Sequence, residues 1–353
     1  MRSWLVACAL LASCGRSNFD GHDADAAADG AGDAVGPSAR ALLSLDRLDP
    51  GVELDDFPLL VTLDDTRAAR DLLDATASNI RFFDSSGNLL AHELDQIGAP
   101  NGPPLLAWVR MPAIVGLTTT LTVEVGGGLP PPSTQSVWSS DYVAVYHLND
   151  GHDSTKNDHT ALPQGAPAFE PYPNCAIGGC QSLNGTADFF SIADMATLAL
   201  PKPTISGWIY QRSSSTIGMA LVSRQAGGLA QDFFLGTTNN AADAQATVTG
   251  GLSNEVKGAA VTIGDWYHFT MKLDGTSLWL YVNGSPAGSG ADAGSLEHDA
   301  TPIVLGAASG QSAYLDGMID EIRLESVPRF DDWVHYEHAA MQDKAIDYGP
   351  IVR

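Results

Sequence analysis

Residues 266–282 read Trp-Tyr-His-Phe-Thr-Met-Lys-Leu-Asp-Gly-Thr-Ser-Leu-Trp-Leu-Tyr-Val. On both sides of Asp274 and Gly275, apolar and polar side chains alternate, which is the pattern of a half-buried β-strand. An Asp-Gly pair supplies the positive φ angles of a type I′ turn. The stretch therefore predicts a β-hairpin formed by residues 266–273 and 278–282.

The composition of the whole chain agrees with this prediction. Its 353 residues include 36 glycines and 20 prolines, and only 17% of the side chains are charged. This mixture is poor in helix formers and rich in turn formers, which favours an all-β architecture. The length suits two domains with tails, and the 44% apolar content is enough to form a hydrophobic core.

The chain is strongly acidic, with 42 acidic and 18 basic side chains and a formal net charge of −24. Nucleic acid is therefore not an expected partner, because phosphate binding needs clustered Lys and Arg. The same charge argues against docking on anionic lipid through the protein surface. Because the sequence contains no run of 18 apolar residues, it predicts no membrane-spanning helix.

The N-terminus has the pattern of a targeting segment. Arg2 precedes an apolar stretch over residues 4–11, so residues 1–13 are predicted to be a signal peptide. Leu11-Ala-Ser-Cys14 resembles the lipobox of bacterial lipoproteins, which implies cleavage before Cys14 and lipid attachment to its thiol. Gly15 resembles outer-membrane sorting, with the protein facing the periplasm or the cell surface and touching the membrane only through its lipid. An ordinary secretory signal is the alternative.

Residues 14–40 are predicted to be a flexible acidic linker. Gly, Ala and Asp dominate this segment, and almost no large apolar side chain could offset the entropy of ordering. The spacing Asp23-Ala-Asp25 suggests a calcium loop, but the third ligand position is Ala27, which argues against it.

Two cysteines lie outside the N-terminal segment, Cys175 and Cys180. An even pair in an exported chain predicts a disulfide, and two of the four intervening residues are Gly, which makes closure easy. A loop this short contributes roughly 2 kcal/mol in the chain-entropy model. A zinc site is the competing interpretation, but no second Cys or Cys/His pair accompanies these two.

Residues 41–126 form a first predicted β module. Strand-like runs occupy residues 57–62, 79–84, 89–94, 106–111 and 119–125; the second and third read as a hairpin, and only residues 66–75 suit a short helix. Leu59-Leu-Val-Thr-Leu-Asp64, Asn79-Ile-Arg-Phe-Phe-Asp-Ser-Ser-Gly87 and Ala107-Trp-Val-Arg-Met-Pro112 resemble the domain-of-unknown-function 2341 family of bacterial surface proteins. That family implies no known chemistry and often directly precedes a jelly-roll domain. Residues 127–137 are a Gly/Pro linker.

Residues 138–348 form the second predicted module. Besides the hairpin, residues 142–148, 181–192, 204–210 and 318–324 have strand patterns. Residues 330–341 are predicted to close the module as a short helix. Asp331 and Asp332 lie in its first turn, and Trp333, Glu337 and Met341 share one face.

This second module closely resembles the laminin-G-like, concanavalin A-like jelly roll. The landmarks occur in order: Leu183-Asn-Gly-Thr-Ala-Asp-Phe-Phe190, Ser206-Gly-Trp-Ile209, Leu280-Tyr-Val-Asn-Gly284 and Gly317-Met-Ile-Asp-Glu-Ile-Arg323. The resemblance implies two packed antiparallel sheets, a binding face and, in many relatives, a structural calcium ion. It implies the Asp320 carboxylate and the Gly185 carbonyl as calcium ligands; the alternative is that Asp320 is an exposed strand acid.

Catalytic patterns in the sequence are incomplete. Retaining glycosidases need two carboxylates about 5 Å apart, which relatives of the laminarinase type carry as Glu-x-Asp-x-x-Glu. Asp320-Glu-Ile-Arg-Leu-Glu325 comes nearest but has the wrong spacing, and Glu93-Leu-Asp95 matches half the pattern in the other module. The chain has no Gly-x-Ser-x-Gly nucleophile elbow. His335-Tyr-Glu-His338 misses the zincin spacings and reads as surface histidines.

Two further groups of residues have a plain and a functional interpretation. His147, His152 and His159 share a segment with Asp150, Asp153 and Asp158, which suits a metal or, more simply, a solvated loop. Trp208, Trp266 and Trp279 lie on predicted strands, where core packing is the simpler role and sugar stacking the alternative.

Taken together, the sequence predicts a cell-envelope lipoprotein with a non-catalytic jelly roll that recognises or adheres to a glycan or an envelope or extracellular protein. A carbohydrate-active enzyme and a purely structural spacer are the alternatives. Calcium is the one cofactor expected, in a structural role.

Overall fold

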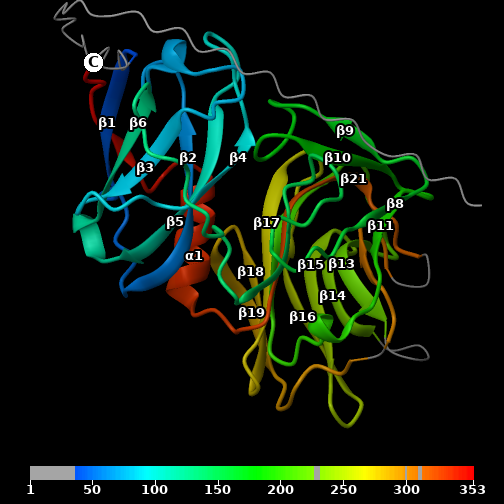
Figure 1. Cartoon of the computed structure of the whole chain (residues 1–353). Helices are drawn as coiled ribbons and strands as arrows, with labels where there is room; N and C mark the ends of the chain where they lie inside the picture. Colours follow the sequence, from blue (N-terminus) through cyan, green and yellow to red (C-terminus); the bar gives the residue numbers. More distant parts are fainter. Residues whose placement is uncertain (1–35, 226–230, 299, 309–311) are drawn as a thin grey trace, which may run out of the picture. The chain divides into compact units, whose positions relative to one another are not determined.

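The computed structural model describes residues 36–225, 231–298, 300–308 and 312–353 (Figure 1). The predicted signal peptide at 1–13, Cys14 and the linker up to residue 35 lie outside the described residues. Strand β1 (Ser38–Ser44) begins inside the segment predicted as linker, so the prediction of a flexible segment up to residue 40 is wrong at its end. None of the described helices is long and apolar enough to cross a membrane.

Two antiparallel sheets form the first module, with strand orders β22-β1-β6-β3 and β2-β5-β4. The remaining bounds are β2 Leu54–Leu63, β3 Ile80–Asp84, β4 His92–Gln96, β5 Leu105–Ile114, β6 Thr120–Gly126 and β22 Asp347–Tyr348. Alternating apolar residues of these strands, among them Phe57, Phe82 and Trp108, are buried together in one core. The first module is therefore β-rich, as predicted.

The hairpin predicted at residues 79–94 is wrong. β3 pairs with β6 and β4 pairs with β5, so the two runs lie in different sheets, joined only by a bridge between Phe83 and Leu89. The turn between them is held by Asp84, whose carboxylate accepts the backbone N–H groups of Ser86 and Asn88. Within residues 66–75 only a 3-10 turn forms, at Arg70–Leu72; two others lie at Gly116–Thr118 and Ala196–Leu198.

The second module is a sandwich of two antiparallel sheets, which confirms the predicted fold class. One sheet has the order β19-β18-β17-β12-β21-β10-β9, with β7 also pairing to β21, and the other has β16-β15-β14-β13-β20-β11-β8. The first contains β7 Tyr142–Tyr146, β9 Ala168–Glu170, β10 Cys180–Asn184, β12 Thr204–Gln211, β17 Trp266–Leu273, β18 Ser277–Val282, β19 Ser285–Ala291 and β21 Asp316–Glu325. The second contains β8 Leu162–Gln164, β11 Phe189–Ile192, β13 Met219–Gln225, β14 Gln231–Thr238, β15 Ala241–Val248, β16 Leu252–Ala260 and β20 Ile303–Leu305.

The predicted hairpin is the β17–β18 pair, in which Leu273 lies opposite Leu278. Its inward side chains, such as Phe269 and Leu280, are buried with Phe233 and Leu235 of the opposite sheet. The core of the sandwich therefore comes from the same alternation that predicted the hairpin.

The C-terminal segment belongs to the first module rather than to the second. Helix α1 (Asp331–Met341) has the predicted bounds to within one residue, and its buried face contacts β2, where Trp333 and Tyr336 lie against the ring of Phe57. Strand β22 then pairs with β1. The predicted division into residues 41–126 and 138–348 is therefore wrong at its last boundary, because both ends of the described chain complete the first module (Figure 1).

Candidate functional site

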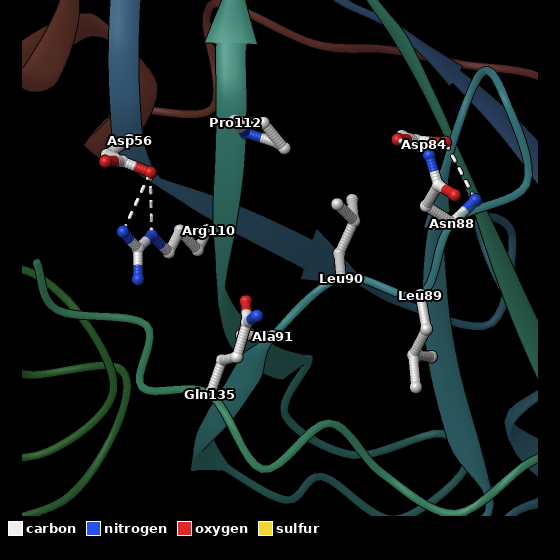
Figure 2. A pocket seen from close by; sticks show the side chains of 9 residues that line it. All are labelled: Asp56, Asp84, Asn88, Leu89, Leu90, Ala91, Arg110, Pro112 and Gln135. Atoms are coloured by element: carbon white, nitrogen blue, oxygen red, sulfur yellow. Dashed lines mark hydrogen bonds and ion pairs between the residues drawn. The ribbon is translucent and has the colours of Figure 1, made fainter.

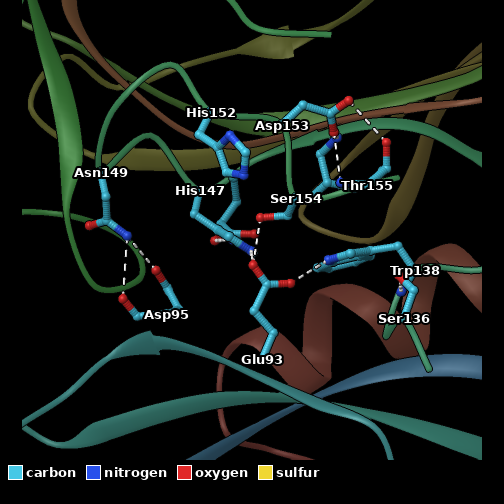
Figure 3. Close-up of polar contacts among 12 residues, drawn as sticks. Glu93, Asp95, Ser136, Trp138, His147, Asn149, His152, Asp153, Ser154 and Thr155 are labelled. Atoms are coloured by element: carbon cyan, nitrogen blue, oxygen red, sulfur yellow. Dashed lines mark hydrogen bonds and ion pairs between the residues drawn. The ribbon is translucent and has the colours of Figure 1, made fainter. Parts of the chain in front are cut away.

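Charged side chains of the two modules meet where the modules touch. Glu93 and Asp95 come from β4, Asp320 and Glu321 from β21, and His147 directly follows β7. Figure 3 shows Glu93 reaching from the sheet of the first module toward His147. One carboxylate oxygen each of Asp95 and Glu321 and one imidazole nitrogen of His147 lie within 4.8 Å of one another. We call these five residues the junction cluster.

A β-bulge in β21 turns two consecutive acids to the same face of the sheet. The register with β12 shifts by one residue between Asp320 and Arg323. Glu321, within this shift, has a φ of 48°, in the left-handed region. Ile319 and Ile322 on either side point into the sandwich core. In a regular strand, neighbouring side chains point to opposite faces, so the extra residue is what places both acids on the side of the first module.

His147 lies between carboxylates of both modules. Its Nδ1 is 2.6 Å from Oε1 of Glu321, and its Nε2 is 3.6 Å from Oε1 of Glu93. The imidazole ring stacks on Trp108 with a centroid separation of 5.8 Å and an interplanar angle of 15°. Burial acts to lower the pKa of His147, but the charges of Glu321 and Asp95 outweigh it and raise this pKa well above its usual value. His147 is therefore an imidazolium at neutral pH.

Glu93 is held by two further donors besides His147. Ser154 Oγ donates to one carboxylate oxygen at 2.6 Å and Trp138 Nε1 donates to the other at 2.8 Å (Figure 3). Burial acts to raise the pKa of Glu93, but the imidazolium of His147 and these two donors lower it below its usual value. Glu93 is therefore the fixed anion of the cluster.

Asp95 has a partner on only one of its oxygens. Asn149 Nδ2 donates to Oδ1 at 2.7 Å, as Figure 3 shows, whereas Oδ2 has no hydrogen-bond partner among the described residues. Burial raises the pKa of Asp95 to about 6; the charge of His147 opposes this rise and that of Glu321 adds to it. A carboxylate with this pKa can exchange a proton or a cation near neutral pH.

Arg323 supports the cluster from beneath. It is fully buried, and its guanidinium donates to Glu337 at 2.6 Å and to Glu321 at 3.2 Å. The same guanidinium lies 4.4 Å from the ring centroid of Trp108 and 5.1 Å from that of Trp138. Arg323 thus connects α1, β21 and β5 in one buried contact.

The predicted disulfide between Cys175 and Cys180 is present. Inside its loop, the N–H of Ile177 donates to Oδ2 of Asp320 at 2.8 Å. The other oxygen of Asp320 is buried without a hydrogen-bond partner. Burial and the charge of Glu321 raise the pKa of Asp320 well above its usual value. The disulfide loop therefore covers the junction cluster from the side of the second module.

The structure does not bring Asp320 and Gly185 together. β10 pairs with β21 so that Asn184 faces Asp316, and the N–H of Gly185 donates to the Leu315 carbonyl at 3.0 Å. Asp320 lies four residues further along β21, about 13 Å away at the usual rise of a strand, and it is fully buried. The predicted pair of calcium ligands is therefore wrong, as is the alternative of an exposed acid. Calcium binding elsewhere stays a prediction.

Of the His- and Asp-rich segment at residues 147–159, only His147 joins the cluster. Asp153 is buried, and its oxygens accept the backbone N–H groups of Val145, Thr155 and His159. Figure 3 shows Asp153 directed toward Thr155. His159 is buried beside Thr197, whereas Asp150, His152 and Asp158 are exposed on the loop. The interpretation as a solvated loop therefore holds for Asp150, His152 and Asp158 and is wrong for His147, Asp153 and His159, which are buried.

The three tryptophans form no exposed platform. Trp208 is buried and its indole N–H contacts Sδ of Met341 at 3.2 Å. Trp266 and Trp279 are half-buried, and their N–H groups donate to the Asn174 carbonyl and to the Asp274 carboxylate. Core packing is thus the role of Trp208, and sugar stacking on it is excluded by its burial.

His338 is buried, contrary to the prediction that it lies at the surface. Its ring lies against Trp208 at 5.5 Å and His268 at 5.9 Å between centroids. Burial, with smaller contributions from Lys344 and His335, lowers the pKa of His338 to about 4. The folded state therefore keeps this imidazole neutral.

We expect His338 to make folding sensitive to acid. Since the imidazole has a pKa of about 6.5 in the unfolded chain and about 4 when folded, its protonation favours unfolding as the pH falls from 6.5 to 4. The effect amounts to roughly 3 kcal/mol over that window. In urea titrations, His338→Phe should gain this much stability relative to the wild type between pH 6.5 and 4. Asp95 and Glu325 titrate in the same range in both proteins and cancel in the difference. A difference that does not change with pH would refute the assignment.

A pocket of about 400 Å³ opens on the first module, away from the cluster (Figure 2). It is lined by Asp56, Asp84, Asn88, Leu89, Leu90, Ala91, Arg110, Pro112 and Gln135. Figure 2 shows that its charged groups already have partners: Arg110 pairs with Asp56 at 2.8 Å, and Asn88 donates to Asp84 at 2.8 Å. We assign no ligand to this pocket.

Comparison with protein families agrees with the sandwich topology. Residues 184–335 match the concanavalin A-like lectin/glucanases superfamily. The match begins at the end of β10 and runs into α1, so it covers most of the second module, which we now call the jelly roll. Among curated proteins, none matches the chain.

Several solved structures align with this chain at low identity. The binding domain of Paraclostridial Mosquitocidal Protein 1 aligns with a TM-score of 0.47 and 13% identity, over 57% of this chain and 52% of that one. Domain 4 of AbnA, a GH43 extracellular arabinanase from Geobacillus stearothermophilus, was solved with arabinotriose. It aligns with a TM-score of 0.44 and 19% identity, over 58% of this chain and 98% of that one. The botulinum neurotoxin serotype D binding domain aligns with a TM-score of 0.43 and 11% identity, over 56% of this chain and 50% of that one. This chain thus spans about half the length of the two toxin domains.

Proposed function

We propose that this chain is an exported, lipid-anchored envelope protein whose jelly roll binds a glycan or a protein without catalysis. The observation that supports this most is a row of side chains across the outer face of the sheet that contains β13–β16. The strand register aligns Leu162, Ser191, Val304, Ser223, Phe234, Gln245 and Glu255 in this row. Their strand neighbours, such as Phe233 and Ala244, point into the core, so the row lies on the opposite face of the sheet. Its middle members Val304, Ser223 and Phe234 are buried there, and its end at Gln245 and Glu255 is open to solvent.

The polar end of this row suits hydroxyl-rich ligands. Gln245 Nε2 donates to Asp243 at 3.0 Å and to Glu255 at 3.3 Å, and Lys257 lies 3.1 Å from Glu255. Carboxylates and amides can exchange such bonds for bonds to sugar hydroxyls. Protein ligands with polar loops suit the same face.

The acids that came nearest to a glycosidase pattern are unsuited to catalysis. Glu321 and Glu325 are fully buried, and each pairs with an arginine, Arg323 at 3.2 Å and Arg329 at 2.5 Å. A general acid or a nucleophile has to reach the substrate, which these carboxylates do not. This favours binding over a carbohydrate-active enzyme, which we keep as the second candidate because its fold class is shared.

The envelope location rests on the N-terminal sequence and on the resemblance of residues 41–126 to the domain-of-unknown-function 2341 family of bacterial surface proteins. If Cys14 carries lipid, the Cys14→Ser protein should leave the membrane fraction while wild type stays there. Cys14→Ser protein that remains in the membrane fraction would contradict the anchor.

The binding proposal is tested by screening the purified chain, with and without calcium, against a glycan array and envelope extracts, together with a β-glucan turnover assay. Gln245→Arg adds bulk and charge within the row and should weaken binding at least tenfold. Asp265→Arg, on an exposed loop of the other sheet, is the matched control and should bind normally. If the Gln245→Arg protein binds as wild type does, the ligand binds at another surface. If wild type binds no glycan and no envelope component, the spacer role is favoured. Cleavage of a β-glucan would establish the enzyme.

A further inference from the structure

We infer that the junction cluster binds one first-row divalent cation of the Zn²⁺ or Mn²⁺ class, with Asp95, His147 and Glu321 as its protein ligands. This site joins two parts of the chain that the sequence keeps far apart, and it goes beyond the proposed binding function, on which it does not depend.

The three ligand atoms are already close to coordination distance. They lie within 4.8 Å of one another, and bonds of 2.0–2.2 Å to one ion require separations up to about 4.2 Å. The closing movement is therefore well under an ångström for each side chain. The contact of His147 with Glu321, now 2.6 Å, has to open slightly as the ion takes the place of the shared proton.

Charge in this region is unbalanced. Five carboxyl groups belong to the cluster or touch its arginine: Glu93, Asp95, Asp320, Glu321 and Glu337. Among the described residues, the cationic side chains in direct contact with them are His147 and Arg323. Buried carboxylates need a compensating charge or a proton, and a divalent cation supplies the charge in one step.

Two carboxylate oxygens of the junction cluster have no hydrogen-bond partner among the described residues. Asp320 is fully buried and its Oδ1 has no hydrogen-bond partner, although the bulge turns it to the same side as Glu321. Oδ2 of Asp95 is also buried without a hydrogen-bond partner among the described residues. Buried polar atoms nearly always have partners, so these two carboxylate oxygens are consistent with a missing cation.

Neighbouring groups form hydrogen bonds that orient the carboxylates of the cluster. Asn149 fixes Asp95 at 2.7 Å, Arg323 fixes Glu321 at 3.2 Å, and the Ile177 N–H fixes Asp320 at 2.8 Å. Such partners orient ligands and are typical of metal sites. One imidazole with carboxylates suits Zn²⁺ or Mn²⁺, whereas calcium prefers oxygen ligands alone.

The test uses the full chain, stripped of metal with EDTA and titrated by calorimetry with ZnCl₂, MnCl₂ or CaCl₂, while elemental analysis counts the ion after native purification. We expect one equivalent of zinc or manganese, a rise in the unfolding temperature on adding it, and binding heats that depend on the buffer because protons are released. Asp95→Asn should weaken binding at least tenfold.

Asp150→Asn is the matched control, since Asp150 is an exposed acid just outside the cluster, and it should bind as wild type does. If Asp95→Asn fails to fold, His147→Gln takes its place, with circular dichroism checking each variant. Absence of saturable zinc or manganese binding by the stripped wild type would overturn the proposal. Binding of calcium alone, or binding unchanged in both ligand variants, would overturn the choice of metal or of ligands.

Discussion

Replacing Arg323 with methionine should lower the free energy of unfolding by about 3–5 kcal/mol. The guanidinium is completely buried between Glu321 and Glu337 and lies over the rings of Trp108 and Trp138. Methionine fills much of the same space but leaves the buried Glu337 without a cation and Glu321 with His147 as its remaining partner. An unpaired buried charge costs far more than the pair itself contributes.

Urea titration at neutral pH measures this loss. Arg353→Met is the matched control, because Arg353 pairs with Asp71 at the surface and such pairs contribute about 0–1 kcal/mol. Adding Glu337→Gln to Arg323→Met should recover part of the loss, since one of the stranded charges is removed. A loss of under 1 kcal/mol in the single variant would show that the two glutamates do not depend on Arg323.

Replacing Trp333 with alanine should cost about 3–5 kcal/mol as well, for a different reason. This side chain is 2% exposed, lies 4.9 Å from the Phe57 ring centroid and is covered by the Arg329 guanidinium at 3.9 Å. Its removal leaves a cavity between α1 and β2 that the surrounding strands cannot fill.

His335→Ala provides the control for this second variant. His335 is exposed on the opposite side of α1, and a surface substitution of this kind stays within about 0.5 kcal/mol. The two proteins are compared by chemical denaturation, with near-ultraviolet circular dichroism reporting the packing of the aromatic rings. Equal stability of the two variants would mean that α1 does not contribute to the core of the first module.

Local features of the fold could be read from the sequence because their causes are local. Alternation around Asp274 and Gly275 determines the β17–β18 hairpin, and two cysteines five positions apart can close only a short loop. The helix at Asp331–Met341 follows from its spacing of buried residues. The pairing of β3 with β6 and of β22 with β1 could not be read, because partner choice depends on residues 40 to 300 positions away.

The candidate site was visible only in halves. Glu93-Leu-Asp95 and Asp320-Glu321 each matched part of a carboxylate pattern, and His147 stood at the start of a polar segment. The cluster residues come from β4, β21 and the end of β7, so a motif search along the sequence finds an incomplete carboxylate pattern in each segment. The bulge that places Asp320 and Glu321 on one face has no sequence signal, since Glu is an uncommon residue at a φ of 48°.

The pairing of β22 with β1 also determines the order in which the protein can be built. Residues 38–126 are synthesised first, but their core includes Trp333, Tyr336 and Ile346, which are made last. The strands of the jelly roll, β7 to β21, are all complete before that point. Residues 38–126 can therefore complete their core only after residues 333–346 have been made. In nascent chains that end before residue 331, hydrogen exchange should show β12 and β17 protected while β1 and β6 still exchange. Strand β1 is thus made first, but its pairing with β22 is among the last to form.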